Sequence, residues 1–268
     1  MNTWNNLPNL SKWFIISHYS DITVPKEKFE DFINLTWTEI QRLAYSIGLR
    51  RRRYVTLDEN YFDMINTEAK AYFLGLLWAD GNNCEYEGKK KVQISLQEGD
   101  KKILEIFKQE LKFTGALSFK SGRMSKGYKK LSKGQYYMQI YNDKLYDTLY
   151  AHGMISNKTI SLKFPTCVPD NLMNHFIRGY FDGDGCIYIK DGTTQCSFNI
   201  CGTKDMVEKI GSVLQTNCTL NPLRIRESKN LFLLDWGGIH QLRRIREYLY
   251  KNATIYLQRK YNKFQQLN

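Results

Sequence analysis

The sequence predicts an α+β protein in which two pseudo-symmetric copies of an αββαββα unit follow a small N-terminal helical module. Two segments, TEAKAYFLGLLWADGN (67–82) and LMNHFIRGYFDGDGC (172–186), repeat one pattern, an apolar helix that ends in Asp-Gly. The residues after each segment repeat as well, whereas those before residue 66 lie outside the repeat. Self-similarity over a whole set of elements indicates a duplicated structural unit.

Each apolar helix is followed by a predicted β-hairpin, because two short strand-like runs stand close together in both copies. These runs are 84–87 and 92–96 in the first copy, and 186–190 and 195–201 in the second. A helix with apolar spacing comes next, at Ile103, Ile106 and Phe107 and again at Val207, Ile210, Val213 and Leu214. Two more strands (117–120, 136–140; 223–227, 231–235) and a closing helix (144–152; 241–251) complete each unit. A duplicated unit without a shared active site would show the same pattern.

The composition favours a globular protein that binds a polyanion. The chain has 268 residues, 42% of them hydrophobic, and a formal net charge of +12, and nucleic acid is the commonest polyanionic partner of such proteins. No apolar run approaches the roughly 18 residues that cross a bilayer, and the N-terminus lacks a secretory signal pattern. The six cysteines form no CxxC pair, so we expect neither a zinc site nor disulfides, and a reducing cytoplasm fits best.

The repeated helices carry small residues on one face. Gly75 and Ala79 are four residues apart in the first helix, and Gly179 and Gly183 are four apart in the second, so each pair shares a helical face. Because glycine weakens a helix interior by about 0.5–1 kcal/mol, its presence there predicts that the two helices pack on each other. Asp80 and Asp184 each follow this face by one residue and would meet at the helix ends.

Two carboxylates at adjacent helix C-termini repel each other and the helix dipoles, so a cation is expected between them. Carboxylate oxygens favour a hard ion such as Mg²⁺, for which Mn²⁺ can substitute. The DGDG run at 182–185 is not an EF-hand loop, because Ile187 and Thr193 stand where glycine and glutamate are required. A plain helix-ending turn remains an alternative for either Asp-Gly.

FLGLLWADG (73–81) and IRGYFDGDG (177–185) resemble the two copies of the LAGLIDADG homing endonuclease signature. The resemblance covers residues 67–268 and implies a saddle of two half-domains that binds DNA. It also implies that Asp80 and Asp184 bind the catalytic metal. Trp78 departs from the acidic sixth position of the signature, whereas Asp182 keeps it.

The resemblance further implies a polar residue at the end of each second strand and a lysine late in each repeat. Gln97 meets the first expectation, but the second copy has Cys201-Gly202 and no evident partner. Lys158 in GMISNKT and Lys260 in YLQRKYN are the best matches for the lysines. Both are catalytic candidates, and the alternative is that they are ordinary surface lysines.

The family's antiparallel sheets read DNA from the major groove, and basic residues occur where such sheets would meet phosphates. The segment 119–135 is basic, with no acid, and Lys229 follows a predicted strand of the second copy. A solvated loop would have the same composition. The candidate DNA-binding residues of the two copies are Lys120, Arg123, Lys126, Lys129, Lys130, Arg224, Arg226 and Lys229.

The N-terminal module is predicted to hold three helices, at about 10–18, 26–33 and 36–49. The last begins with a capping box formed by Thr36 and Glu39 and stops at Gly48. The trio resembles a helix-turn-helix module, followed by a basic linker that would meet the DNA backbone, Arg50, Arg51, Arg52 and Arg53. A small helical cap with a basic linker is the alternative.

Together these features predict a monomeric, Mg²⁺-dependent endonuclease that cuts both strands of a long asymmetric duplex DNA site. The expected divisions are 1–66 for the helical module, 67–166 for the first half-domain and 167–268 for the second. We expect no membrane association, and a place at the nucleoid of a prokaryotic or phage-infected cell, with an organellar origin left open. The alternatives are a non-catalytic DNA-binding regulator and an RNA-binding intron maturase.

Overall fold

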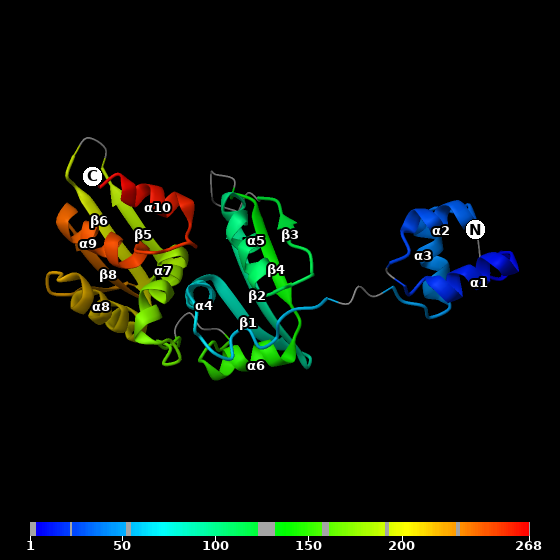
Figure 1. Ribbon diagram of the computed structural model, residues 1–268, viewed down its shortest axis with the longest axis horizontal. Coiled ribbons are helices and arrows are strands. Elements are labelled where there is room, and N and C mark those ends of the chain that lie inside the picture. The colour runs from blue at the N-terminus through cyan, green and yellow to red at the C-terminus, as the bar shows by residue number, and fades with distance from the viewer. Residues whose placement is uncertain are drawn as a thin grey trace. The chain divides into compact units, whose positions relative to one another are not determined.

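The computed structural model describes residues 4–21, 23–51, 55–122, 132–156, 161–190, 193–228 and 231–267. The chain forms two compact units, 1–55 and 56–268, here called the N-terminal unit and the larger unit (Figure 1). Within the described ranges, no helix combines the length and apolar character that a membrane span requires.

The N-terminal unit contains a 3₁₀ turn, η1 (Trp4–Asn6), and three α-helices, α1 (Asn9–His18), α2 (Lys26–Ile33) and α3 (Trp37–Ser46). Its core is built from one apolar face of each helix and includes Ile15, Phe29 and Ile40. The predicted capping box is confirmed, because Thr36 accepts a hydrogen bond from the amide of Glu39, whose carboxylate accepts one from the amide of Thr36.

The larger unit holds both copies of the αββαββα pattern, which confirms the predicted fold class. The first half-domain runs α4 (Glu68–Asp80), β1 (Gly81–Tyr86), β2 (Lys89–Gln97), the 3₁₀ turn η2 (Glu98–Asp100), α5 (Lys101–Glu110), β3 (Ser118–Lys120), β4 (Gln135–Ile140) and α6 (Asp143–Ala151). The second runs η4 (Asp170–Leu172), α7 (Met173–Asp184), β5 (Gly185–Ile189), β6 (Cys196–Gly202), α8 (Lys204–Cys218), β7 (Arg224–Ser228), β8 (Leu231–Gly237), α9 (Ile239–Tyr250) and α10 (Gln258–Gln265).

Each half-domain is built on a four-stranded antiparallel sheet, and the two sheets have equivalent strand orders, β1-β2-β4-β3 and β5-β6-β8-β7. Alternate residues of the central strands are buried, such as Ile94 on β2 and Ile200 on β6. Helices α5 and α6 pack against the first sheet, and α8 and α9 against the second (Figure 1). The opposite face of each sheet is therefore the one that presents polar side chains.

The larger unit begins earlier than residue 67, where the sequence-based division placed the first half-domain. Tyr61, Phe62 and Ile65 are buried in its core. The amide of Asp58 donates to the carbonyl of Leu111 at 2.8 Å, which ties the start of this segment to the end of α5. Residues 56–66 are thus a packed part of the larger unit rather than part of a linker.

A buried polar cluster joins the two half-domains near the start of α4. The guanidinium of Arg178 on α7 is fully buried and contacts Glu68 of α4 at 2.7 Å. It also donates to Nδ1 of His175 at 2.7 Å and to the carbonyls of Leu249 and Ile255. Glu68 in turn accepts hydrogen bonds from Thr254 and Ile255. Because each charge has a partner, the cluster can be buried without an uncompensated ion.

His175 should make the folded state sensitive to acid. Its burial, together with the charge of Arg178, lowers the pKa of His175 from 6.5 to about 4. Between pH 6.5 and pH 4, His175 therefore binds a proton in the unfolded chain but not in the folded chain. The free energy of unfolding should fall as the pH falls through this range, by at most about 1.4 kcal/mol per pH unit. Denaturant melts of wild type and His175→Asn, which keeps an acceptor for Arg178 but does not titrate, measure this. Identical pH dependence of the two proteins would remove His175 as the cause.

Candidate active site

Helices α4 and α7 meet through their small residues. A β-carbon added to Gly75 would lie 2.0 Å from the carbonyl oxygen of Phe176, and one added to Gly179 would lie 2.0 Å from that of Tyr72. No side chain fits at such a distance, so the two backbones touch directly. A β-carbon on Gly183 would likewise lie 2.3 Å from the β-carbon of Ala79. The structure thus places all four small residues at the seam between the half-domains.

Asp80 and Asp184 are the last residues of α4 and α7, and both are exposed. The close approach of the helices brings these two ends together, because Oδ2 of Asp80 lies 3.0 Å from the position that a β-carbon of Gly183 would take. Both carboxylates sit where a helix dipole is negative. The end of the seam is accordingly an exposed, electronegative place that suits a cation.

Tyr180 is a neighbour of Asp184 that the sequence did not single out. Its hydroxyl donates to the carbonyl of Cys201 at 3.1 Å. Burial raises the pKa of Tyr180, and the Asp184 carboxylate raises it further. The equivalent position of the first motif is Leu76, so only the second half-domain has a hydroxyl here. That difference between aligned motifs was the available signal.

The ends of the second strands carry different polar residues. Gly81 pairs with Ile94 and Gly185 with Ile200, so Gln97 and Thr203 each stand three residues beyond the equivalent isoleucine. Thr203 is thus the counterpart that the sequence pattern at Cys201-Gly202 did not reveal, because the second hairpin is two residues longer. Its hydroxyl donates to the carbonyl of Leu162 at 2.6 Å.

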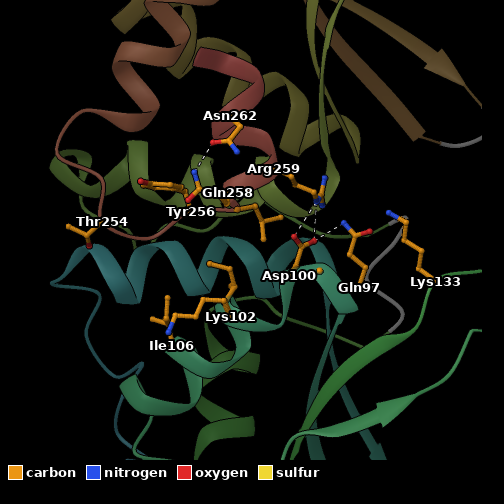
Figure 2. Close-up of a pocket in the computed structure, with 13 residues that line it drawn as sticks. Gln97, Asp100, Lys102, Ile106, Lys133, Thr254, Tyr256, Gln258, Arg259 and Asn262 are labelled. Atoms are coloured by element: carbon orange, nitrogen blue, oxygen red, sulfur yellow. Dashed lines mark hydrogen bonds and ion pairs between the residues drawn. The ribbon is translucent and has the colours of Figure 1, made fainter. Parts of the chain in front are cut away.

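Gln97 belongs to a polar network where the end of β2 in the first half-domain meets α10 of the second. Its side-chain amide donates to Asp100 at 2.8 Å, and Arg259 of α10 forms an ion pair with the same carboxylate at 3.0 Å. Figure 2 shows both side chains directed at Asp100 from the end of β2 and from α10. A cavity of about 500 Å³ opens beside them and is also lined by Lys102 and Lys133. Its basic lining suits a phosphate.

Lys260 is placed differently from the expectation of a lysine that faces the substrate. It is buried, and its ammonium group donates to the carbonyls of Phe181, Asp182 and Gly185 at the end of α7. Burial lowers the pKa of Lys260 to about 8, although Asp182 and Asp80 oppose this change. An ammonium group has three donors, and all three are used. In this structure Lys260 therefore holds the helix that carries Asp184.

Three basic DNA-binding candidates of the larger unit lie within the described residues, and all three are on the edge strands β3 and β7. Lys120 ends β3, while Arg224 and Arg226 lie on β7, where Arg226 pairs with Asp235 at 3.0 Å. The remaining candidates fall outside the described residues, namely Lys158, Arg123, Lys126, Lys129, Lys130 and Lys229 in this unit and Arg52 and Arg53 in the linker.

The two described linker arginines contact the N-terminal unit itself. Arg51 donates to the carbonyls of Tyr19 and Val24, and its guanidinium lies over the rings of Phe29 and Trp37. Arg50 is exposed, lies over the ring of Tyr45 and donates to two backbone carbonyls. Arg51 is therefore part of the packing of the unit rather than of an open basic linker, a role that its place in a run of four arginines hid.

No protein-family model matches the sequence, and no curated protein matches it significantly. Solved structures do match. The homing endonuclease I-WcaI bound to its DNA recognition sequence superposes with a TM-score of 0.56 and 14% identity, covering 82% of this chain and 96% of that one. The meganuclease I-SmaMI, bound to uncleaveable DNA, gives 0.51 and 12%, covering 75% and 90%. The I-LtrWI LAGLIDADG homing endonuclease, bound to target DNA, gives 0.50 and 14%, covering 75% and 89%. This chain has the fold of the LAGLIDADG homing endonucleases.

Proposed function

We propose that the protein is a monomeric endonuclease that cuts both strands of duplex DNA at a long, asymmetric site with the help of Mg²⁺ or Mn²⁺. The observation that carries this proposal is the meeting of Asp80 and Asp184, exposed at the ends of two helices that touch backbone to backbone. The solved structures of the same fold support it, since I-WcaI is bound to its DNA recognition sequence. One chain supplies both motifs, so a second copy is not needed.

The donor groups at the seam fit a hard divalent cation. Asp80 and Asp184 offer carboxylate oxygens, and nowhere in the described ranges do three or more His, Cys, Asp or Glu side chains gather as a closed metal site. Mg²⁺ suits such a place, because it binds through one or two carboxylates and takes its remaining ligands from water and phosphate. When bound there, the metal would activate a water and stabilise the leaving oxygen of a phosphodiester.

The polar faces of the two sheets are proposed to read the bases. On the first sheet, Gln139 donates to Gln93 at 2.8 Å, so the two amides are held as a cross-strand pair. The equivalent positions on the second sheet are Asn199 and Asp235, and Asp235 holds Arg226. Amides suit adenine and arginine suits guanine in the major groove. The two half-domains therefore present different chemistry, which favours an asymmetric target.

The N-terminal unit is proposed to add DNA affinity as a helix-turn-helix module. Three residues separate α2 from α3, and the first, Asn34, has the left-handed conformation (φ 58°) that ends a helix sharply. Thr38, Arg42 and Tyr45 lie exposed along α3 and form the face that would enter the groove. The family resemblance does not extend to this unit, so the assignment rests on this geometry.

Removing residues 1–55 should weaken binding without stopping cleavage, because the candidate metal ligands lie in the larger unit. For each phosphate that the shortened protein no longer neutralises, the slope of log affinity against log salt should flatten by about 0.9. Titrations of the full and shortened chains over a range of salt measure this, with cleavage assayed at low salt. An unchanged affinity and slope would contradict a DNA-binding role for the N-terminal unit.

The central test is to incubate the purified protein with randomised duplex DNA and Mg²⁺ and to sequence the cut ends. A single long motif at the cut positions is the expected result. Binding to a specific duplex without any cutting would favour a regulator of the same fold. Preferential binding to structured intron RNA would favour a maturase.

A further inference from the structure

A short segment after each repeat crosses the seam. The two segments contain a sequence that occurs in both halves of the chain, NKTISL at 157–162 and NATIYL at 252–257. Their described parts, 161–164 and 254–260, are here called crossing segments 1 and 2. Each lies against the motif helix of its own half-domain and also contacts the other half-domain, so each is a tie between the two.

Crossing segment 1 is anchored by Trp78, the sixth residue of the first motif. The indole nitrogen of Trp78 donates to the carbonyl of Lys163 at 3.0 Å. In the other half-domain, Thr203 donates to the carbonyl of Leu162 at 2.6 Å, and Asp205 accepts from the amide of Phe164 at 2.7 Å. Trp78, Leu162, Thr203 and Asp184 line one cavity of about 150 Å³. The segment thus lies beside Asp184.

Crossing segment 2 is anchored by Asp182, the sixth residue of the second motif. Asp182 is buried, and its Oδ2 accepts from the amide of Leu257 at 2.8 Å and from the hydroxyl of Tyr72 at 2.7 Å. Lys260 then returns to the end of α7. In the other half-domain, Arg259 reaches Asp100, which holds Gln97.

The two anchors have opposite hydrogen-bonding polarity. Trp78 donates to the carbonyl of Lys163, the residue just after the repeated sequence, whereas Asp182 accepts from the amide of Leu257, the last residue of that sequence, so the two contacts fall one residue apart in the aligned segments. A tryptophan and an aspartate thus perform one task at one motif position. This explains how the first motif can lack an acid there without losing the arrangement.

We infer that Trp78 and Asp182 are positioning residues, and that each sets the geometry around the carboxylate of the opposite motif. Trp78 fixes the segment that holds Thr203 beside Asp184, and Asp182 fixes the segment that holds Arg259, Asp100 and Gln97 in the half-domain of Asp80. This inference rests on the proposed function, because its consequence is that the two anchors govern different DNA strands. A displacement of about 1 Å at a reacting group can cost on the order of a hundredfold in rate.

The test uses Trp78→Phe, which removes the indole donor, and Asp182→Leu, which removes the acceptor at similar volume. Trp236→Phe is the matched control, because Trp236 is also buried and donates to a carbonyl, that of Asn221 at 3.1 Å, away from the crossing segments. Cleavage of each strand is followed separately at saturating DNA. We expect Trp78→Phe to slow cleavage of one strand, and Asp182→Leu to slow cleavage of the other, each by tenfold or more relative to the remaining strand, so that nicked DNA accumulates. Asp182→Asn keeps an oxygen acceptor and should restore most of the cleavage rate.

Amide hydrogen exchange provides a readout that does not require cleavage. Trp78→Phe should speed exchange at Phe164 about tenfold and leave Leu257 protected, whereas Asp182→Leu should do the reverse. Equal slowing of both strands, slowing of the same strand, or an equal effect of Trp236→Phe would overturn the inference. If the Leu variant does not fold, Trp78→Phe and its control Trp236→Phe still decide the role of Trp78, and the inference fails if Trp78→Phe slows both strands equally. Wild-type protein that cuts no DNA would reject the proposed function, and unchanged exchange in Trp78→Phe would reject the anchoring independently.

Discussion

Asp80→Asn and Asp184→Asn are each expected to lose double-strand cleavage by on the order of a thousandfold while the protein stays folded and bound to DNA. Both carboxylates are exposed at the ends of α4 and α7, so neither supports the core. Loss of a bound metal removes several kcal/mol of transition-state stabilisation, and each 1.36 kcal/mol is a factor of ten in rate. Cleavage of a supercoiled plasmid that carries the site measures the effect.

Thermal midpoints separate a metal ligand from a structural cap. Without Mg²⁺ either substitution should be neutral or stabilising, because it removes one of two carboxylates at adjacent negative helix ends. Addition of Mg²⁺ should raise the midpoint of wild type more than that of either variant. Asp147→Asn, at an exposed ion pair with Lys90 on the surface, is the control and should cut normally. If a folded Asn variant of Asp80 or Asp184 still cut both strands at the wild-type rate, the catalytic role proposed for that aspartate would be wrong.

The fold could be predicted from the sequence because its signals are local and occur twice. The apolar stretch before each Asp-Gly became α4 and α7, and the strand and helix patterns after them became two equivalent sheets with their helices. Periodicity depends only on neighbours along the chain. The segment 56–66 has no such pattern, and its place in the larger unit depends on distant contacts, such as that between Asp58 and Leu111.

The candidate site was predicted less completely, because its details depend on contacts between residues far apart in sequence. The sequence suggested that Asp80 and Asp184 would lie close together, since small residues preceded both. It could not show that the ammonium group of Lys260 donates hydrogen bonds to carbonyls at the end of α7, or that Arg51 packs on Phe29. Thr203 was missed for a simpler reason, namely a hairpin two residues longer than its counterpart.

Gly179→Ala is expected to destabilise the protein strongly, because it adds a methyl group at the seam between α4 and α7. The new β-carbon would lie 2.0 Å from the carbonyl oxygen of Tyr72 and 2.9 Å from the amide nitrogen of Leu76. Both atoms belong to the backbone of α4, so no side chain can rotate away and the helices must separate. Overpacking of a protein core typically costs about 1–3 kcal/mol of stability. Because the new methyl group would meet backbone atoms, we expect a cost at or above the upper end of that range.

The sign of the effect distinguishes a packing glycine from an ordinary one. Alanine in place of glycine normally stabilises a helix by about 0.5–1 kcal/mol, so a loss of stability at Gly179 reports the contact with α4. Gly99→Ala is the matched control, because no atom lies within 4 Å of its β-carbon position, and it should be neutral or slightly stabilising. Gly75→Ala, which meets the carbonyl of Phe176 at 2.0 Å, should behave like Gly179→Ala.

Chemical denaturation of the three variants measures the difference, and a Gly179→Ala protein as stable as wild type would contradict the close approach of α4 and α7. Because the same separation moves Asp80 away from Asp184, cleavage by the folded fraction should fall together with stability at Gly75 and Gly179.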